Sequence, residues 1–235
     1  MTAPGSPKLP PAPSRRERAR DATVAEIKDT ARALLVQQGP DALTVRAIAR
    51  EMGLTPPALY RYFAGHEELV TAMCTDVLDE ITAALEAARD TVGRDDPVGR
   101  LMATCRGFRE WSLAHPREFQ LTFASMVDKP KDGGVAFGAV FLGVFVEIWA
   151  HQPFLVPTDD QLPHALVAQL REFSARTGDR LPLGVLVAYL SGWVRLYGAV
   201  TIEVFGHLGF ALADPEPMFE AMLADMRRAL TTPLS

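Results

Sequence analysis

The sequence has little cysteine. Only Cys74 and Cys105 occur in the 235 residues, and 31 positions separate them. This spacing matches neither a disulfide framework nor a CxxC metal or redox pair. We therefore expect both thiols to fill the core of a cytoplasmic protein.

The motifs of common enzyme classes are also absent. The histidines lie at positions 66, 115, 151, 164 and 207 and show no HExxH metal spacing, and the sequence contains no GxSxG elbow, P-loop or GxGxxG. Asp159-Asp160 falls in a proline-flanked turn, where solvation is the expected fate of both carboxylates. We predict no catalytic residues, no metal and no cofactor; an enzyme built on the second half of the chain is a remote alternative.

No apolar run is long enough for a bilayer. The segments "VAFGAVFLGVFV" and "LGVLVAYLSGWV" fall short of the ~18 to 20 residues that a span needs, and Glu147, Arg195 and Glu203 lie close to them. The first twenty residues are rich in proline and then arginine, so no secretory signal is predicted. These features favour a soluble chain with no membrane partner.

Charge is unevenly distributed. The net charge is −5, yet residues 1–65 hold ten Lys/Arg against six Asp/Glu, a net of +4, and residues 66–235 hold fourteen against twenty-three, a net of −9. Such asymmetry indicates a basic module that meets phosphate, joined to an acidic module with another task.

Proline content and helical periodicity divide the chain. Residues 1–20 contain five prolines and then Arg15, Arg16, Arg18 and Arg20, and we predict a disordered arm that either follows a minor groove or merely keeps the tail soluble. A helical period begins at Ala22 and ends at Gly39-Pro40. These patterns predict a division of the chain into residues 1–20, 21–66 and 67–235.

A helix-turn-helix pattern follows the first helix. Thr44 is a good N-cap for "VRAIAREM", and Gly53 ends that helix. Thr55 then supplies a cap oxygen for a second short helix, whose first turn the consecutive prolines 56 and 57 make rigid. Leu59 and Phe63 lie one turn apart and face inward.

The remaining faces of this second helix suit DNA. Pro57 and Ala58 permit close approach to bases, Tyr60 and Tyr62 are able to donate to phosphates, and Arg61 reaches a phosphate or a guanine edge. The alternative is an ordinary three-helix subdomain in which the tyrosines only pack.

The run from Ile27 to Leu69 resembles the N-terminal domain of tetracycline-repressor (TetR) family regulators. The resemblance rests on the Thr44 cap, Ile48-Ala49, Gly53-Leu54-Thr55, Leu59-Tyr60, Phe63 and Glu67-Glu68-Leu69. It implies that Thr44 and Tyr60 contact phosphates and that Arg46 reaches a base or a phosphate. The residues that it implies for DNA contact are Thr44, Arg46, Thr55, Pro56, Pro57, Ala58, Tyr60, Arg61, Tyr62 and His66.

His66 departs from the family pattern, which usually has a lysine there as a phosphate ligand. A histidine is only partly charged near neutral pH, so this contact is expected to be weaker and more sensitive to pH. The alternative is a helix-start residue that touches nothing.

The rest of the chain reads as helical, which makes the fold class all-α. A long helix is predicted from Glu67 to Arg89, and further helices over 98–115, 116–126, 135–152, 162–176, 183–207 and 217–230. Aromatic residues at helical spacing predict a ligand pocket lined by Phe108, Trp111, Phe123, Phe141, Phe145 and Trp149, with plain core packing as the alternative. The small residues Gly184, Ala188 and Gly192, with Trp193, predict a helix-packing dimer interface.

Together these patterns predict a homodimeric regulator, usually a repressor in this family, that binds a palindromic DNA operator and is released by a small, apolar effector. The alternative from another class is a helical small-molecule binding protein whose helix-turn-helix no longer recognises DNA.

Overall fold

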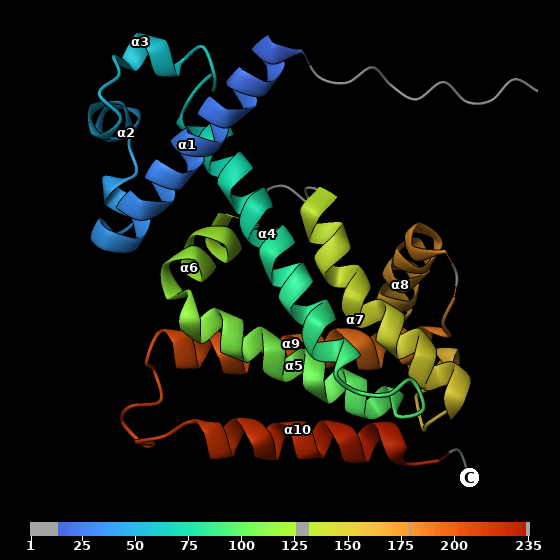
Figure 1. Cartoon of the computed structure of the whole chain (residues 1–235). Coiled ribbons are helices and arrows are strands. Elements are labelled where there is room, and N and C mark those ends of the chain that lie inside the picture. The colour runs from blue at the N-terminus through green and yellow to red at the C-terminus, as the bar shows by residue number, and fades with distance from the viewer. Residues whose placement is uncertain (1–13, 126–131, 179, 234–235) are drawn as a thin grey trace, which may run out of the picture. The chain divides into compact units, whose positions relative to one another are not determined.

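The computed structural model describes residues 14–125, 132–178 and 180–233, and within these ranges the protein is built of α-helices (Figure 1). Short 3-10 turns at Pro40–Ala42 and Asp159–Gln161 and one isolated bridge between Phe154 and Pro233 complete the regular structure. The all-α prediction is confirmed. The helices are α1 (Arg15–Gln38), α2 (Val45–Glu51), α3 (Pro56–Leu59), α4 (His66–Asp90), α5 (Pro97–Ala114), α6 (Pro116–Ser125), α7 (Asp132–His151), α8 (His164–Thr177), α9 (Leu183–Val204) and α10 (Glu216–Thr231).

The chain forms two compact units, Met1–Met73 and Cys74–Ser235. The division falls within α4, seven residues later than the boundary predicted after His66. The helix-turn-helix therefore shares its unit with α1 and the first residues of α4.

The first helix starts earlier than predicted. Arg15 to Arg20 belong to α1 and not to an irregular arm, because Ser14 begins the helix with a capping box. The Ser14 hydroxyl accepts from the Glu17 N–H at 3.2 Å, and the Glu17 carboxylate accepts from the Ser14 N–H at 2.6 Å. The remainder of the predicted arm, residues 1–13, lies outside the described residues.

The core of the first unit comes from one stripe of α1 and the inner faces of the helices after it. Ile27, Ala31, Leu34 and Leu35 are the buried residues of α1. They share this unit with the buried side chains Leu43, Ile48, Ala49, Leu59, Phe63, Leu69 and Met73. Gly39 ends α1 with φ of 87°, a left-handed value that favours glycine. This conformation of Gly39 ends α1 sharply, so that the chain can turn toward α2.

The second unit is organised around α5. This helix contacts α6, α7, α9 and α10, and α8 packs on α9 (Figure 1). Eleven of its eighteen residues are buried, including Leu101, Cys105 and Phe108. Cys74 and Cys105 are both buried, as predicted, and burial raises the pKa of Cys105 to about 12.

Arg100 is the most deeply buried charged side chain of α5 and ties three segments together. Its guanidinium donates to the Glu147 carboxylate at 3.0 Å, to the Val92 carbonyl at 3.1 Å and to the Asp90 carboxylate at 3.2 Å. The neighbouring Arg89 hydrogen-bonds Asp90 and, with Arg100, lowers the pKa of that carboxyl to about 2. The end of α4, the start of α5 and α7 are thereby fixed to one another.

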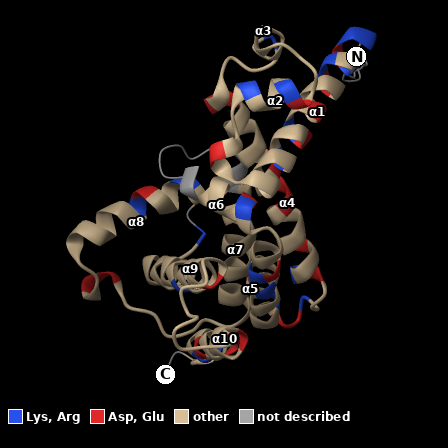
Figure 2. Ribbon diagram, turned by 90° about the vertical axis from the view of Figure 1, so that its left-hand side faces the viewer, with Lys and Arg blue, Asp and Glu red and all other residues tan. Residues whose placement is uncertain are grey.

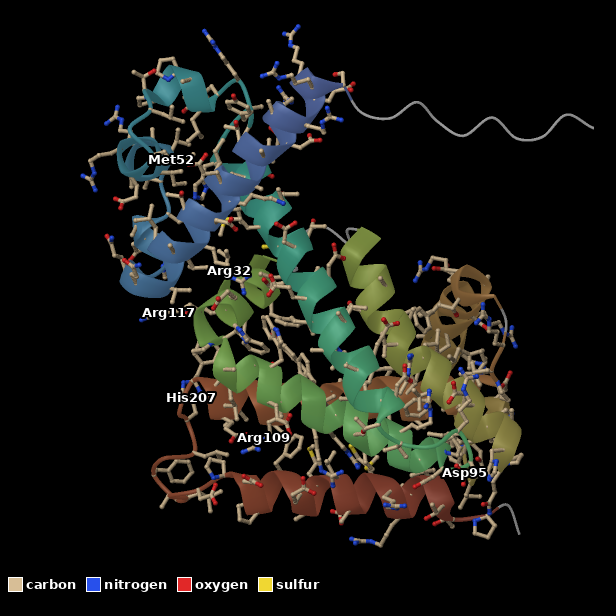
Figure 3. The ribbon with its side chains drawn as sticks, in the orientation of Figure 1. Arg32, Met52, Asp95, Arg109, Arg117 and His207 are labelled. Carbon is tan, nitrogen blue, oxygen red and sulfur yellow. The ribbon has the colours of Figure 1, made fainter. Side chains whose placement is uncertain are left out.

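Arg109 also links helices, at the other end of the second unit. Figure 3 shows its side chain between α5 and α10. It forms a bidentate ion pair with Glu203 of α9 at 2.6 and 2.8 Å and lies 5.2 Å from the centre of the Phe219 ring of α10. The side chains of Arg109 and Glu203 are only 13% and 8% exposed. Removing one partner of a buried pair leaves an uncompensated charge, so this contact matters for stability.

We predict that Glu203→Ala lowers the free energy of unfolding by about 3 kcal/mol or more. The matched control is Glu220→Ala, which breaks a bidentate pair with Arg106 whose side chains are 46% and 40% exposed. Solvent screening limits its loss to about 1 kcal/mol or less. Urea unfolding followed by circular dichroism measures both, and equal losses would contradict this account.

Candidate nucleic-acid interface

The first helix of the motif is held at its start by Thr44. Its hydroxyl accepts a hydrogen bond from the Ala47 N–H at 3.1 Å, and its backbone is extended, with φ of −122° and ψ of 148°. Ile48 and Ala49 of α2 are buried, whereas Arg46 and Arg50 are exposed. The predicted N-cap is confirmed, and α2 turns its arginines to solvent.

The turn between the two helices depends on Gly53. Its φ is 65°, and its N–H donates to the Arg50 carbonyl at 3.2 Å. The Leu54 N–H closes the end of α2 on the Ala49 carbonyl at 2.8 Å. Among the described residues no heavy atom lies within 4 Å of a Cβ built at Gly53, so the backbone conformation and not crowding favours glycine here.

The second helix begins at Pro56, and its first two residues are the prolines. The Thr55 carbonyl accepts from the Ala58 N–H at 2.9 Å. The prediction that the Thr55 hydroxyl caps this helix is wrong, since among the described residues it accepts no capping hydrogen bond. The fixed φ of the prolines sets the start of α3 instead, because neither needs an N–H partner in the first turn.

The second helix is also shorter than predicted. α3 ends at Leu59, and Tyr60, Arg61 and Tyr62 lie in the turn that follows it. Hydrogen bonds from the Tyr62 and Phe63 N–H groups to the Leu59 carbonyl, at 3.0 and 3.2 Å, hold this turn. We call residues 56–63 the recognition segment. Its two anchors, Leu59 and Phe63, are buried as predicted.

The side chains between these anchors project outward. Tyr60 is 53% exposed, Arg61 is exposed and Tyr62 is half-buried. Of the other residues predicted for DNA contact, Thr44, Arg46, Thr55, Pro57 and His66 are exposed, and Pro56 and Ala58 are half-buried. His66 is the first residue of α4. All ten lie in the first unit on three successive elements, and Figure 2 shows Lys and Arg on α2 and on the first turns of α1.

Arg20 is a residue that the sequence patterns missed. It lies in the second turn of α1, and its guanidinium donates to the Arg61 carbonyl at 3.3 Å. The same guanidinium lies 5.5 Å from the centre of the Tyr62 ring. Arg16 and Arg20 are four positions apart, which would have placed them on one helical face had this stretch been read as helix.

The residues predicted for a ligand pocket do not surround one space. Phe108, Phe123 and Phe141 join Phe137 and Trp193 in a cluster whose ring centres are 5.4 to 6.5 Å apart. Trp111 stacks on His115 at 4.5 Å, and Trp149 packs edge-on against Phe154 at 5.6 Å. This arrangement is core packing, the alternative raised from the sequence.

Two hollows lined by described residues lie near these aromatics. Phe141 and Phe145 border a void of only about 10 Å³, too small for an organic molecule. A cleft of about 180 Å³ lies between the end of α7, α9 and α10. Its lining is apolar apart from Ser191 and Arg195 and consists of Phe145, Phe154, Leu155, Ala188, Ser191, Gly192, Arg195, Met226, Ala229 and Leu230.

The small residues predicted for a dimer interface face the chain's own core. A Cβ at Gly184 would lie 2.2 Å from the Pro157 carbonyl oxygen, and one at Gly192 would lie 3.3 Å from the Met226 side chain. Ala188 borders the α7–α9–α10 cleft, and Trp193 belongs to the aromatic cluster. These contacts lie within one chain, and the role of the four residues in a dimer stays a prediction.

The exposed face of α9 is rotated from that stripe. Together with α8 it borders a groove of about 410 Å³, lined by Leu166, Leu170, Val187, Leu190, Ser191, Val194 and Arg195. Val194 is 69% exposed, and Ile202 and Phe205 continue the exposed apolar face at helical spacing. We call this surface the α8–α9 face.

The contrast between Thr44 and Thr55 gives a direct test of the local geometry. We predict that Thr44→Ala lowers the free energy of unfolding by about 1 kcal/mol, because the Ala47 N–H loses its acceptor. Thr55→Ala is the matched control and should change the free energy of unfolding by only a few tenths of that amount. Thermal unfolding of both variants measures the difference; a larger loss for Thr55→Ala would contradict the structure.

Comparisons with known proteins match both units. Residues 27–73 match the model "Bacterial regulatory proteins, tetR family", and residues 101–226 match "Tetracyclin repressor-like, C-terminal domain". The HTH-type transcriptional regulator Rv1816 of Mycobacterium tuberculosis is 30% identical over 216 residues, which cover 88% of this chain and 92% of that protein. Mb1846 of Mycobacterium bovis, an HTH-type transcriptional regulator too, gives the same values.

Solved structures agree. The regulatory protein SCO4313 superimposes with a TM-score of 0.67 at 30% identity, covering 91% of this chain and 98% of that one. A TetR family transcription regulator from Marinobacter aquaeolei VT8 has a TM-score of 0.56 at 16% identity, covering 91% and 97%, which shows the shared fold alone. The C-terminal family model matches more than half of the chain, and the helix-turn-helix precedes it in the sequence. The chain therefore belongs to the TetR family of DNA-binding transcriptional regulators.

Proposed function

We propose that this regulator binds a palindromic operator as a homodimer, represses transcription, and leaves the DNA when a small molecule binds its C-terminal unit. The observation that carries the DNA step is the recognition segment. Its buried anchors Leu59 and Phe63 hold Tyr60, Arg61 and Tyr62 on a fixed backbone turned to solvent. Preorganised side chains bind DNA without first losing the entropy of an unordered loop.

The residues divide into two roles. The exposed hydroxyls of Thr44 and Tyr60 suit phosphate oxygens, which position the protein but carry no sequence information. Pro57, Ala58 and Arg61 suit base edges in the major groove, where Arg61 distinguishes guanine. His66 replaces the usual lysine at the start of α4, so we propose that it adds a weaker phosphate contact.

The α8–α9 face supports the homodimer. Helix α9 is long and apolar, yet only 22% of an apolar 18-residue stretch of it is buried within one chain. Val187, Leu190 and Val194 line the groove beside α8. Two copies meeting across this face would bury both apolar surfaces about a two-fold axis. A palindromic operator matches such a symmetric pair.

A membrane is the competing explanation for α9, since its length and composition alone would permit a span. This evidence is weak for a single helix, because core helices of soluble proteins pass the same test. Arg195 and Glu203 lie within it, and Glu203 is paired with Arg109 of α5. We propose a cytoplasmic protein in which a second copy covers α9.

The effector site is proposed in the cleft between α7, α9 and α10. This cleft offers about 180 Å³ with apolar walls and the Arg195 guanidinium. An apolar molecule carrying a carboxylate fits that chemistry. To release DNA it must bind the DNA-incompetent state more tightly, typically by ~1 to 3 kcal/mol of coupling.

Fluorescence anisotropy on labelled duplexes tests the proposal as a whole. Duplexes that tile the DNA upstream of the protein's own gene are titrated at several salt concentrations against a scrambled competitor. Sequence-selective binding with a steep salt dependence supports the regulator. Binding to no duplex would favour the alternative, a small-molecule binding protein with a non-functional helix-turn-helix.

The first specific prediction concerns Arg61. We expect Arg61→Ala to weaken binding to the selected duplex about ten-fold or more, since a bidentate contact to guanine contributes ~1 to 3 kcal/mol of discrimination. For the same reason, the difference in affinity between the selected and the scrambled duplex should become smaller. Arg171→Ala, at an exposed arginine of α8, is the control of equal charge. An unchanged preference in Arg61→Ala would remove Arg61 from base reading.

The second prediction concerns the α8–α9 face. We expect Val194→Asp to shift the protein from dimer to monomer in light scattering, because the carboxylate would have to be buried without a partner. Phe210→Asp is the control, since Phe210 is 89% exposed in the connection between α9 and α10 and outside the groove. A Val194→Asp protein that stays dimeric would rule this face out.

The third prediction concerns the effector cleft. In a panel of small apolar carboxylates and their matching amides, we expect the carboxylates that bind to raise Tm in the wild-type protein by mass action. Arg195→Gln should lose most of that rise, measured against its own Tm without ligand because Arg195 also lines the α8–α9 face. Equal shifts from carboxylate and amide would exclude a charge contact with Arg195.

A further inference from the structure

The first turns of α1 and the end of the recognition segment border one hollow. It encloses about 700 Å³ and is lined by Ser14, Arg16, Glu17, Ala19, Arg20, Thr23, Arg61 and Tyr62. We call it the arginine groove. Arg16, Arg20 and Thr23 lie on one face of α1, at steps of four and three residues. The opposite wall is Arg61 and Tyr62, from a segment about forty positions later.

The charge of this groove is positive. Three arginines line it against one carboxylate, and that carboxylate, Glu17, is held by the Ser14 N–H in the capping box. Arg16, Arg20 and Arg61 are all exposed, so their guanidinium groups are accessible to a ligand in solvent. A guanidinium fork matches the oxygens of a phosphate group.

Arg20 has a second task besides its charge. One of its N–H groups donates to the Arg61 carbonyl, and its plane lies against the Tyr62 ring. This hydrogen bond links α1 to the backbone of the recognition segment. The bond thereby fixes the backbone of Arg61, whose side chain is proposed to read a base.

We propose that the arginine groove holds a backbone phosphate of the DNA duplex beside the bases that the recognition segment reads. Arg16 is the new phosphate ligand, and Arg20 is a positioning residue that holds Arg61 and Tyr62 in place. This inference rests on the proposed DNA-binding function. The occupant is DNA and not a free anion because the groove is continuous with the recognition segment, sharing Arg61 and Tyr62 with it.

The salt dependence of DNA binding tests the phosphate contact. The full-length wild type, Arg16→Ala and Arg15→Ala are titrated by anisotropy with a labelled duplex of scrambled sequence and with the selected upstream duplex. A phosphate contact contributes about 0.9 to the slope of log K against log salt. Arg16→Ala should lose about that much on both duplexes. Arg15→Ala removes the same charge one position away, outside the groove lining, and should lose clearly less.

A substitution that keeps the charge tests the positioning role. Lysine cannot reproduce the planar fork that meets both the Arg61 carbonyl and the Tyr62 ring. Arg20→Lys should therefore retain the wild-type salt slope on the scrambled duplex, while its preference for the selected duplex falls several-fold. Arg20→Ala should show a smaller salt slope on the scrambled duplex and also a lower preference for the selected duplex.

The outcomes separate the two levels of the proposal. Equal slopes for wild type, Arg16→Ala and Arg15→Ala would overturn the phosphate site while leaving DNA binding intact, and so would equal losses in both variants. An unchanged preference in Arg20→Lys would overturn the positioning role. A wild-type protein that binds neither duplex would refute the proposed function itself, and the inference with it.

Discussion

The burial of Leu59 and Phe63 is the constraint on which DNA recognition depends. These two side chains are one helical turn apart and both lie in the core of the first unit, so the backbone between them has little freedom. Gly53 makes the turn that brings them there, and the prolines at 56 and 57 fix the direction in which the segment leaves it. Tyr60, Arg61 and Tyr62 face solvent as a result. Arg20 then holds this segment from outside, through the Arg61 carbonyl.

The second unit uses ion pairs of two buried arginines to fix its helices. Arg100 ties the end of α4 and the start of α5 to α7, and Arg109 ties α5 to α9 and α10. Buried pairs of this kind add little net stability over apolar packing, but they oppose alternative registers because a slipped helix would leave a charge unpaired. The aromatic cluster around Phe108 fills the space between these helices. An apolar face of α9 is left uncovered, which is the reason to infer a second copy.

Much of the fold could be predicted from the sequence, because its signals are local. Thr44, Gly53 and the prolines act on the backbone within a few residues of themselves, and the helical periods of the second unit match the observed helices within a few residues. The start of α1 was missed because its capping box and arginines carry no apolar period. The exposed face of α9 could not be predicted, because small residues such as Gly184 and Gly192 pack equally well against the same chain or against a second chain. Only their contacts with Pro157 and Met226 show that they pack within one chain. The aromatic residues likewise signal burial without indicating whether they enclose space.

The central claim is that two rigid recognition segments read DNA as a symmetric pair. Hydroxyl-radical footprinting of the full-length protein on the duplex that it selects tests this most directly. Two protected segments on one face of the duplex, with centres about one helical turn or a whole multiple of it apart and related by two-fold symmetry, are the predicted result. A single protected segment, or uniform protection along the duplex, would contradict it.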